Sequence, residues 1–120
     1  MRAVGIILAG GNSRKMKELT SRRAAAAMPV AGSYRAIDFT LSNMTNSHIQ
    51  KVAVLTQYNA RSLNEHLNSS KWWDFGRKQG GLYVFTPTIT DDNGYWYRGT
   101  ADAIYQNLDF LRRCHEPYVI

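Results

Sequence analysis

The stretch Ala3-Val4-Gly5-Ile6-Ile7-Leu8-Ala9, followed by Gly10-Gly11, decides the fold of this chain. Its apolar residues run without polar alternation, which is typical of a strand covered on both faces in a parallel sheet flanked by helices. The two glycines let backbone N–H groups approach a ligand, usually a phosphate, and a tight turn that needs glycine for steric reasons alone is the alternative. Basic residues follow at Arg14, Lys15, Lys17, Arg22 and Arg23.

Length and composition set the outer bounds. The chain has 120 residues, 44% of them hydrophobic, and a formal net charge of +6. This length suits one domain with a real core, and the charge favours anionic partners without naming them. No apolar stretch approaches the ~20 residues of a membrane span, and no signal peptide precedes the first strand, so we expect a cytoplasmic protein. The single Cys114 excludes an internal disulfide and is expected to be a half-buried thiol at a helix end.

Apolar spacing predicts alternating strands and helices along the whole chain. This order favours an α/β fold of three layers with a parallel sheet and right-handed crossovers, in which ligands bind outside the carboxyl ends of the strands. After the first strand the predicted elements are a helix over 37–48, a strand over 49–56, a helix over 60–67, a strand over 82–85, a helix capped by Thr100 and a strand over 117–120. The last strand stops in mid-element, so we expect a fragment of a longer protein rather than a frayed native end.

Three segments should meet at one edge of this sheet. Gly10-Gly11 follows the first strand, Gln57 follows the second, and the loop before Thr100 follows the third. Gln57 carries an amide that suits the edge of a nucleobase, although an exposed polar strand end is as common. The segment 96–102 joins aromatic residues, a glycine and a helix start, and either holds a base or sugar phosphate or packs on the sheet edge.

The motifs, taken together in this order, resemble bacterial ADP-glucose pyrophosphorylase, the glucose-1-phosphate adenylyltransferase of glycogen synthesis. They are Leu8-Ala9-Gly10-Gly11, Leu19-Thr20, Arg23-Ala24, Tyr34-Arg35-Ala36-Ile37-Asp38-Phe39, Leu41-Ser42-Asn43, Asn46-Ser47, Thr56-Gln57-Tyr58 and Trp96-Tyr97-Arg98-Gly99-Thr100-Ala101-Asp102-Ala103. The resemblance implies the N-terminal part of a Rossmann-like nucleotidyltransferase domain of the sugar-nucleotide pyrophosphorylase type. The family's C-terminal left-handed β-helix would then be absent from this chain.

The resemblance also implies a reaction and a site. ATP and glucose 1-phosphate would give ADP-glucose and pyrophosphate with Mg²⁺, whose ligand in the family would lie beyond residue 120, so no metal ligand is assigned here. The nucleotide would be lined by Leu8, Ala9, Gly10 and Gly11. The adenine would contact Gln57 and the turn Gly99-Thr100-Ala101, while basic residues hold the triphosphate.

Two departures from the family pattern bear on catalysis. Lys15 stands where the family has a phosphate-orienting arginine, which keeps the charge but loses the bidentate fork. Ala25 stands where the family has its catalytic lysine, so no catalytic residue is intact. This pattern resembles the second, GlgD-type subunit of Gram-positive bacteria, which modulates a catalytic paralogue in a hetero-oligomer.

Other readings remain open. Arg22 occupies the place of a family residue that binds sugar-phosphate activators, or it belongs to a solvated charge run. The chain is alternatively a competent catalytic subunit, or an assembly subunit that binds no ligand. A nucleic-acid module would stack bases on Lys71-Trp72-Trp73 and Tyr95-Trp96-Tyr97, but no such motif appears and the basic residues are scattered, so we expect neither a nucleic-acid nor a membrane partner.

Overall fold

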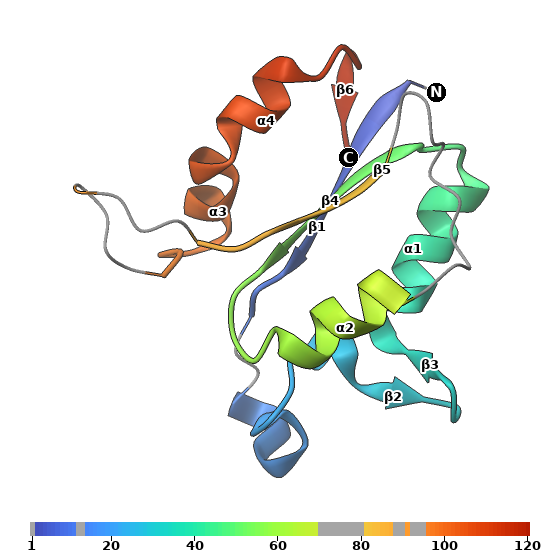
Figure 1. Ribbon diagram of the computed structural model, residues 1–120, viewed down its shortest axis with the longest axis vertical. Helices are drawn as coiled ribbons and strands as arrows, with labels where there is room; N and C mark the ends of the chain where they lie inside the picture. Colours follow the sequence, from blue (N-terminus) through green and yellow to red (C-terminus); the bar gives the residue numbers. More distant parts are fainter. Residues whose placement is uncertain (1, 12–13, 70–80, 88–90, 92–95) are drawn as a thin grey trace.

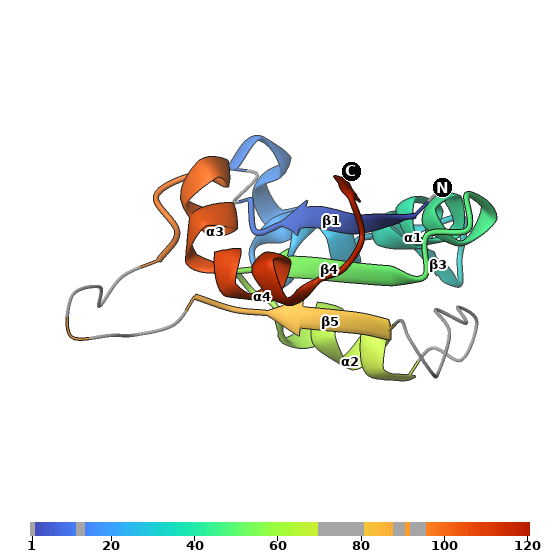
Figure 2. The same ribbon diagram turned by 90° about the horizontal axis from the view of Figure 1, so that it is seen from above.

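A four-stranded parallel sheet forms the centre of the computed structural model, which describes residues 2–11, 14–69, 81–87, 91 and 96–120 (Figure 1). The strand order is β5-β4-β1-β6. The strands are β1 (Ala3–Ala9), β4 (Lys51–Thr56), β5 (Gly81–Phe85) and β6 (Tyr118–Val119). Ile6 pairs with Ala53, which pairs with Tyr83, so the carboxyl ends of β1, β4 and β5 meet at one edge (Figure 2).

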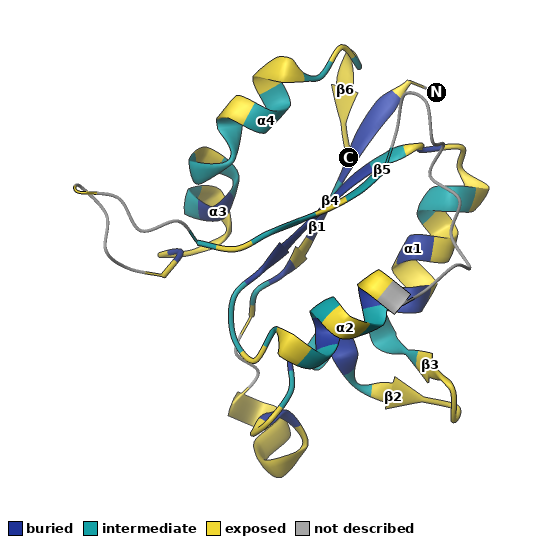
Figure 3. Cartoon of the chain, viewed as in Figure 1, coloured by how far each residue is buried: buried dark blue, intermediate teal, exposed yellow. Residues whose placement is uncertain are grey.

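Helices cover both faces of this sheet, as the sequence predicts. They are α1 (Ala36–Asn46), α2 (Arg61–Ser69), α3 (Thr100–Gln106) and α4 (Leu108–Arg113). Alternate strand residues point to opposite layers: Ile7 and Val54 pack with the residues of α1 and α2, whereas Leu55 packs with those of α3. The interior of the molecule is therefore divided by β1 and β4, which are buried along most of their length (Figure 3).

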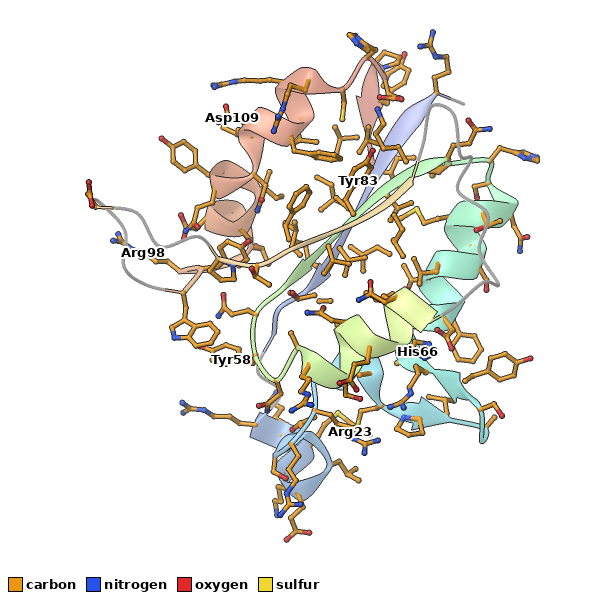
Figure 4. All side chains as sticks on the ribbon, viewed as in Figure 1. Arg23, Tyr58, His66, Tyr83, Arg98 and Asp109 are labelled. Carbon is orange, nitrogen blue, oxygen red and sulfur yellow. The ribbon has the colours of Figure 1, made fainter. Side chains whose placement is uncertain are left out.

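Helix α1 owes its position to one acidic side chain. Asp38 is 6% exposed, and its Oδ2 accepts a hydrogen bond from the backbone N–H of Arg35 at 2.7 Å, which fixes the first turn. Its Oδ1 lies 2.6 Å from His66 Nε2 on α2, so the same carboxylate joins the two helices (Figure 4). The helix spans residues 36–46 rather than the predicted 37–48, and β4 begins at Lys51 rather than at residue 49.

The predicted last helix is in fact two. Thr100 is the first residue of α3 rather than its cap, because Gly99 occupies the N-cap position. Asn107 ends α3 and begins α4 with φ −109° and ψ 16°, a conformation that leaves the regular helix. The apolar spacing alone did not reveal this break, because Ile104, Leu108 and Leu111 keep a helical period across it.

The segment between β1 and α1 has more regular structure than the sequence pattern predicts. It contains η1 (Arg14–Thr20), which is made of 3₁₀ turns interrupted by a kink at Lys17, and the 3₁₀ helix η2 (Ala25–Ala27). A hairpin of β2 (Pro29–Val30) and β3 (Tyr34–Arg35) follows. Ala27 in η2 and Ala24, the residue before η2, are buried. The loop around Lys71-Trp72-Trp73 and residue Tyr95 lie outside the described residues.

The C-terminal end of α4 carries the single cysteine. Cys114 is half-buried, as predicted, and its Sγ–H donates to the Phe110 carbonyl at 3.2 Å. Burial raises the pKa of its thiol, which keeps it protonated at neutral pH. Nearby, Lys51 Nζ lies 3.3 Å from Glu116 Oε2 and ties the start of β4 to the segment before β6.

In the described part of the chain, no helix is both long and apolar enough to cross a bilayer.

A glycine in β1 lets α1 approach the sheet. A Cβ on Gly5 would lie 2.9 Å from Met44 Sδ and 3.3 Å from Val52 Cγ2. We expect Gly5→Val to destabilise the protein by about 1–3 kcal/mol, because the added methyls overfill the layer between β1 and α1. Thermal unfolding of the intact protein measures this, with Thr40→Val on the exposed side of α1 as control. An unchanged melting temperature for Gly5→Val would show that Met44 has room to move aside.

Candidate functional site

A cavity of about 320 Å³ opens at the carboxyl edge of the sheet. The three segments that the sequence placed at one edge do meet there, with Gly10 and Gly11 from the end of β1, Gln57 from the end of β4, and Gly99 and Thr100 before and at the start of α3. The remaining lining residues are Leu8, Leu55, Tyr58, Tyr97, Arg98 and Ala103. This is the edge where parallel α/β sheets bind their ligands.

Apolar side chains form the wall of the cavity on the sheet side. Leu8 and Leu55 are register partners in β1 and β4, so they lie side by side on the same face. Leu55 is fully covered, but Leu8 is 46% exposed, which is high for a leucine at the end of a buried strand. Tyr97 and Ala103 add to this surface from the α3 side. A mainly apolar wall with a few polar groups at its rim suits a flat aromatic ligand such as a nucleobase.

Gln57 is fixed by the segment that faces it. The backbone N–H of Tyr97 donates to Gln57 Oε1 at 2.8 Å, and this bond orients the amide. The side-chain oxygen is therefore engaged, and the NH₂ group is the part of Gln57 that offers donors to a ligand. The bond also links the end of β4 to the segment before α3, because Gln57 and Tyr97 are 40 residues apart in the chain.

The two glycines of the loop serve different purposes. A Cβ on Gly10 would lie 3.1 Å from the Cβ of Gln57, so this position needs glycine for packing. A Cβ on Gly11 would meet nothing within 4 Å among the described residues, so its missing side chain leaves open space beside the cavity. Each glycine thus fits one of the two interpretations of this loop. Gly10 is required for packing, and Gly11 leaves space that a ligand could occupy.

The first turn of α3 favours an uncharged group of a ligand, such as a base, over a phosphate. The carboxylate of Asp102 accepts a hydrogen bond from the backbone N–H of Arg98 at 2.9 Å and another from Gln106 Nε2 at 3.0 Å. A phosphate at this turn would meet the negative charge of Asp102. Of the two ligands that the sequence allowed at this segment, the base is therefore the better fit.

The basic residues lie on η1 and the turn after it, beside this edge of the sheet (Figure 4). Arg14, Lys15, Lys17 and Arg22 are exposed and Arg23 is half-buried, and none of them lines the cavity. Asn59 holds this segment: its Nδ2 donates to the Thr20 carbonyl at 3.2 Å, and its own carbonyl accepts from the Ala24 N–H at 3.2 Å. Sequence reasoning missed Asn59, whose φ of 47° is a conformation that asparagine tolerates.

Three other predicted residues lie outside the cavity lining. Ala25 is half-buried in η2, Ala101 is exposed on α3, and Ala9 is buried with its methyl group in the core beneath α1 and α2. Any contact of Ala9 with the cavity comes from its main chain. Tyr97, which belongs to the segment 96–102 that the sequence predicts either to hold a base or sugar phosphate or to pack on the sheet edge, is 9% exposed and forms part of the cavity wall.

Comparison with known proteins agrees with this architecture. The sequence profile of the nucleotidyl transferase family matches residues 4–120. The chain belongs to the nucleotidyl transferase family. Glucose-1-phosphate adenylyltransferases from Clostridium novyi (strain NT) and Thermosipho africanus are each 46% identical to it over 117 residues, and that from Clostridium kluyveri is 47% identical. These matches cover 98% of this chain but only 28–31% of each relative.

Tyr58 lines the cavity and forms an aromatic pair with Trp96, which is not one of the lining residues. Their rings stack with centroids 5.0 Å apart and an interplanar angle of 13°. Tyr58 follows Gln57, and Trp96 precedes Tyr97. The stack is therefore a second contact between the same two segments that the Gln57–Tyr97 hydrogen bond joins. Trp96 is 53% exposed, which leaves its outer face to solvent.

The double role of Gln57 can be separated by substitution. We expect Gln57→Leu to speed exchange of the Tyr97 amide hydrogen roughly fivefold, because loss of one hydrogen bond costs about 1 kcal/mol. Gln57→Glu keeps an acceptor and should leave this exchange unchanged while removing the NH₂ donors. Hydrogen exchange resolved at Tyr97 measures both. Equal protection in all three proteins would mean that the Tyr97 N–H does not depend on this side chain.

Proposed function

We propose that this chain is part of a glucose-1-phosphate adenylyltransferase subunit of the regulatory type, which binds an adenine nucleotide but does not form ADP-glucose on its own. The reaction of the whole enzyme would be ATP plus glucose 1-phosphate to ADP-glucose plus pyrophosphate. Support comes from the relatives that carry this name and from the apolar cavity at the carboxyl edge of the sheet.

The observation that carries the regulatory assignment is Ala25. This residue lies in η2, which packs against α1 and α2, and its side chain is a half-buried methyl group. It stands where the resemblance places the catalytic lysine, and a methyl group cannot neutralise a phosphate. Lys15, on the exposed η1, keeps a charge at the place of the arginine but not its two-pronged geometry.

The chain's own residues would act by positioning. Leu8 and Leu55 would take one face of the base, and the Gln57 NH₂ group would donate to a base acceptor. The basic residues of η1 would attract the triphosphate without contacting the base. In transfer of a nucleotidyl group, the protein contributes positioning and charge stabilisation rather than covalent chemistry. Loss of one charge at the phosphates is therefore a sufficient reason for low activity.

Mg²⁺ is expected for the complete enzyme. No group of three or more His, Cys, Asp or Glu side chains gathers within the described ranges. The part of the protein that would supply metal ligands is, by the resemblance, beyond residue 120. No step of the proposed role is routed through the metal.

We further propose that the partner of this subunit is a catalytic paralogue in a hetero-oligomer, and that sugar-phosphate effectors act near Arg22. Arg22 is exposed and lies between η1 and η2. It follows Ser21, whose carbonyl accepts a hydrogen bond from Asn59 Nδ2. A guanidinium suits phosphate geometry, which supports an effector contact at this place.

The deciding experiment uses the intact protein alone. We expect it to bind ATP in titration calorimetry and to form ADP-glucose roughly a hundredfold more slowly than a catalytic subunit, or slower still, when ATP, glucose 1-phosphate and Mg²⁺ are supplied. The Clostridium novyi enzyme, a similar relative, serves as the reference. An equal rate would contradict the regulatory assignment and make the chain part of a competent transferase. Absence of ATP binding would contradict the nucleotide site and favour an assembly subunit.

A further inference from the structure

We propose that Asn107, which does not line the cavity, is a positioning residue for the nucleotide site and acts through the hydroxyl group of Tyr97. This inference rests on the proposed function, because it assumes that the cavity binds a nucleotide. Apolar spacing does not reveal this role, since Asn107 lies within an uninterrupted helical pattern.

The side-chain amide of Asn107 makes two hydrogen bonds. Its Nδ2 donates to the Ala103 carbonyl at 2.8 Å and to Tyr97 Oη at 3.1 Å. Both protons of one NH₂ group are thus directed at residues of the cavity wall, because Tyr97 and Ala103 line the cavity. The break between α3 and α4 falls at the residue that makes these two bonds.

Tyr97 is held at both ends as a result. Gln57 Oε1 accepts from its backbone N–H at 2.8 Å, and Asn107 donates to its hydroxyl oxygen at 3.1 Å. Its ring between these two bonds is nearly buried and forms one wall of the cavity. The backbone hydrogen bond fixes the position of the Tyr97 main chain, and the hydroxyl hydrogen bond fixes the orientation of its ring.

Asn107 is itself anchored from the far side. The next helix, α4, packs Phe110 onto the aromatic rings of β5, with centroids 5.1 Å from Tyr83 and 5.0 Å from Phe85. The backbone N–H of Phe110 donates to the Asn107 carbonyl at 3.1 Å. Asn107 therefore connects the wall of the cavity to the aromatic cluster of Tyr83, Phe85 and Phe110 at the edge of the sheet, and this connection fixes its position relative to Tyr97.

A double-mutant cycle in the intact protein tests the inference. Asn107→Ala removes the donor and Tyr97→Phe removes the acceptor, and ATP affinity is measured by titration calorimetry for each variant and for the pair. We expect Tyr97→Phe to weaken ATP binding roughly twofold to tenfold, the loss that follows from one hydrogen bond. Asn107→Ala should weaken it at least as much, because this change also removes the bond to the Ala103 carbonyl. The double variant should bind no more weakly than the weaker single one, because both changes remove the same contact.

Two matched control variants each remove one polar group that takes no part in the hydrogen bond between Asn107 and Tyr97. Tyr105→Phe removes the hydroxyl of a tyrosine that is 70% exposed on α3, and Gln106→Ala removes an amide that donates to Asp102 instead of Tyr97. Tyr105→Phe should leave ATP affinity unchanged, and Gln106→Ala should show no coupling with Tyr97→Phe. Tyr97→Phe removes only the hydroxyl and keeps the ring. Its ATP affinity therefore still tests the hydrogen bond if Asn107→Ala lowers the melting temperature.

The outcomes separate this inference from the function it rests on. Additive losses for Asn107→Ala and Tyr97→Phe would show that Asn107 does not act through the tyrosine hydroxyl, and unchanged affinity in both would show that the bond has no role in binding. Either result overturns the inference while the nucleotide site stands. If the unaltered protein fails to bind ATP, the proposed function fails first and the positioning role fails with it.

Discussion

Restoring lysine at position 25 together with arginine at position 15 is expected to raise ADP-glucose formation by roughly a hundredfold to a thousandfold. The gain follows because Ala25→Lys would return one positive charge to the phosphate region, and Lys15→Arg would return the bidentate guanidinium while keeping the charge. The fold should accept both changes. Lys15 is exposed, and Ala25 is only half-buried, so a lysine there can extend its ammonium group to solvent or ligand.

The measurement is the rate of ADP-glucose synthesis by the intact protein, alone, in four forms: unaltered, Ala25→Lys, Lys15→Arg and the pair. Ala26→Lys is the matched control, because Ala26 is the next residue of η2, is also half-buried, and packs against the main core. Ala25→Lys should account for most of the gain and Ala26→Lys for none. A restored pair that stays as inactive as the unaltered protein would show that residues beyond these two have also been lost.

Replacing Gly11 by leucine is expected to weaken ATP binding roughly tenfold to a hundredfold without lowering stability, because the side chain would occupy the cavity. The change is tolerable in the folded state, since a Cβ on Gly11 meets no described atom within 4 Å and Gly11 has no positive φ. A leucine side chain takes up a substantial part of a cavity of about 320 Å³.

Calorimetry with ATP and a thermal melt separate binding from stability here. Gly10→Ala is the contrasting variant: its Cβ would lie 3.1 Å from that of Gln57, so it should lower the melting temperature. Thr40→Leu, on the exposed side of α1, should change neither quantity. Undiminished ATP affinity in Gly11→Leu would place the nucleotide elsewhere on the molecule and contradict the proposed site.

The parts of the fold that sequence could predict are those set by strong periodic patterns. The run from Ala3 to Ala9 has no polar alternation and is a doubly covered parallel strand. The rule that parallel strands share their carboxyl edge then brought Gly11, Gln57 and Thr100 together without any tertiary information. These are the positions where local pattern and global architecture agree.

The parts that sequence could not predict depend on single side-chain contacts. Asn107 interrupts a helix whose apolar spacing is unbroken, and its reason for doing so is a tyrosine ten residues earlier. Asn59 fixes the basic segment through bonds to Thr20 and Ala24, residues more than thirty positions away. Such contacts leave no period in the sequence, so neither propensity nor spacing reveals them.

The strand order has a consequence for how the protein is made. β1 pairs with β4 on one side and with β6 on the other, and Ala3 is the register partner of Tyr118. A ribosome that adds about 5–20 residues per second would therefore leave one edge of this apolar strand unpaired for roughly 6–24 seconds. Contacts so distant in sequence also slow folding. The nascent chain is thus expected to depend on chaperones until β6 has emerged.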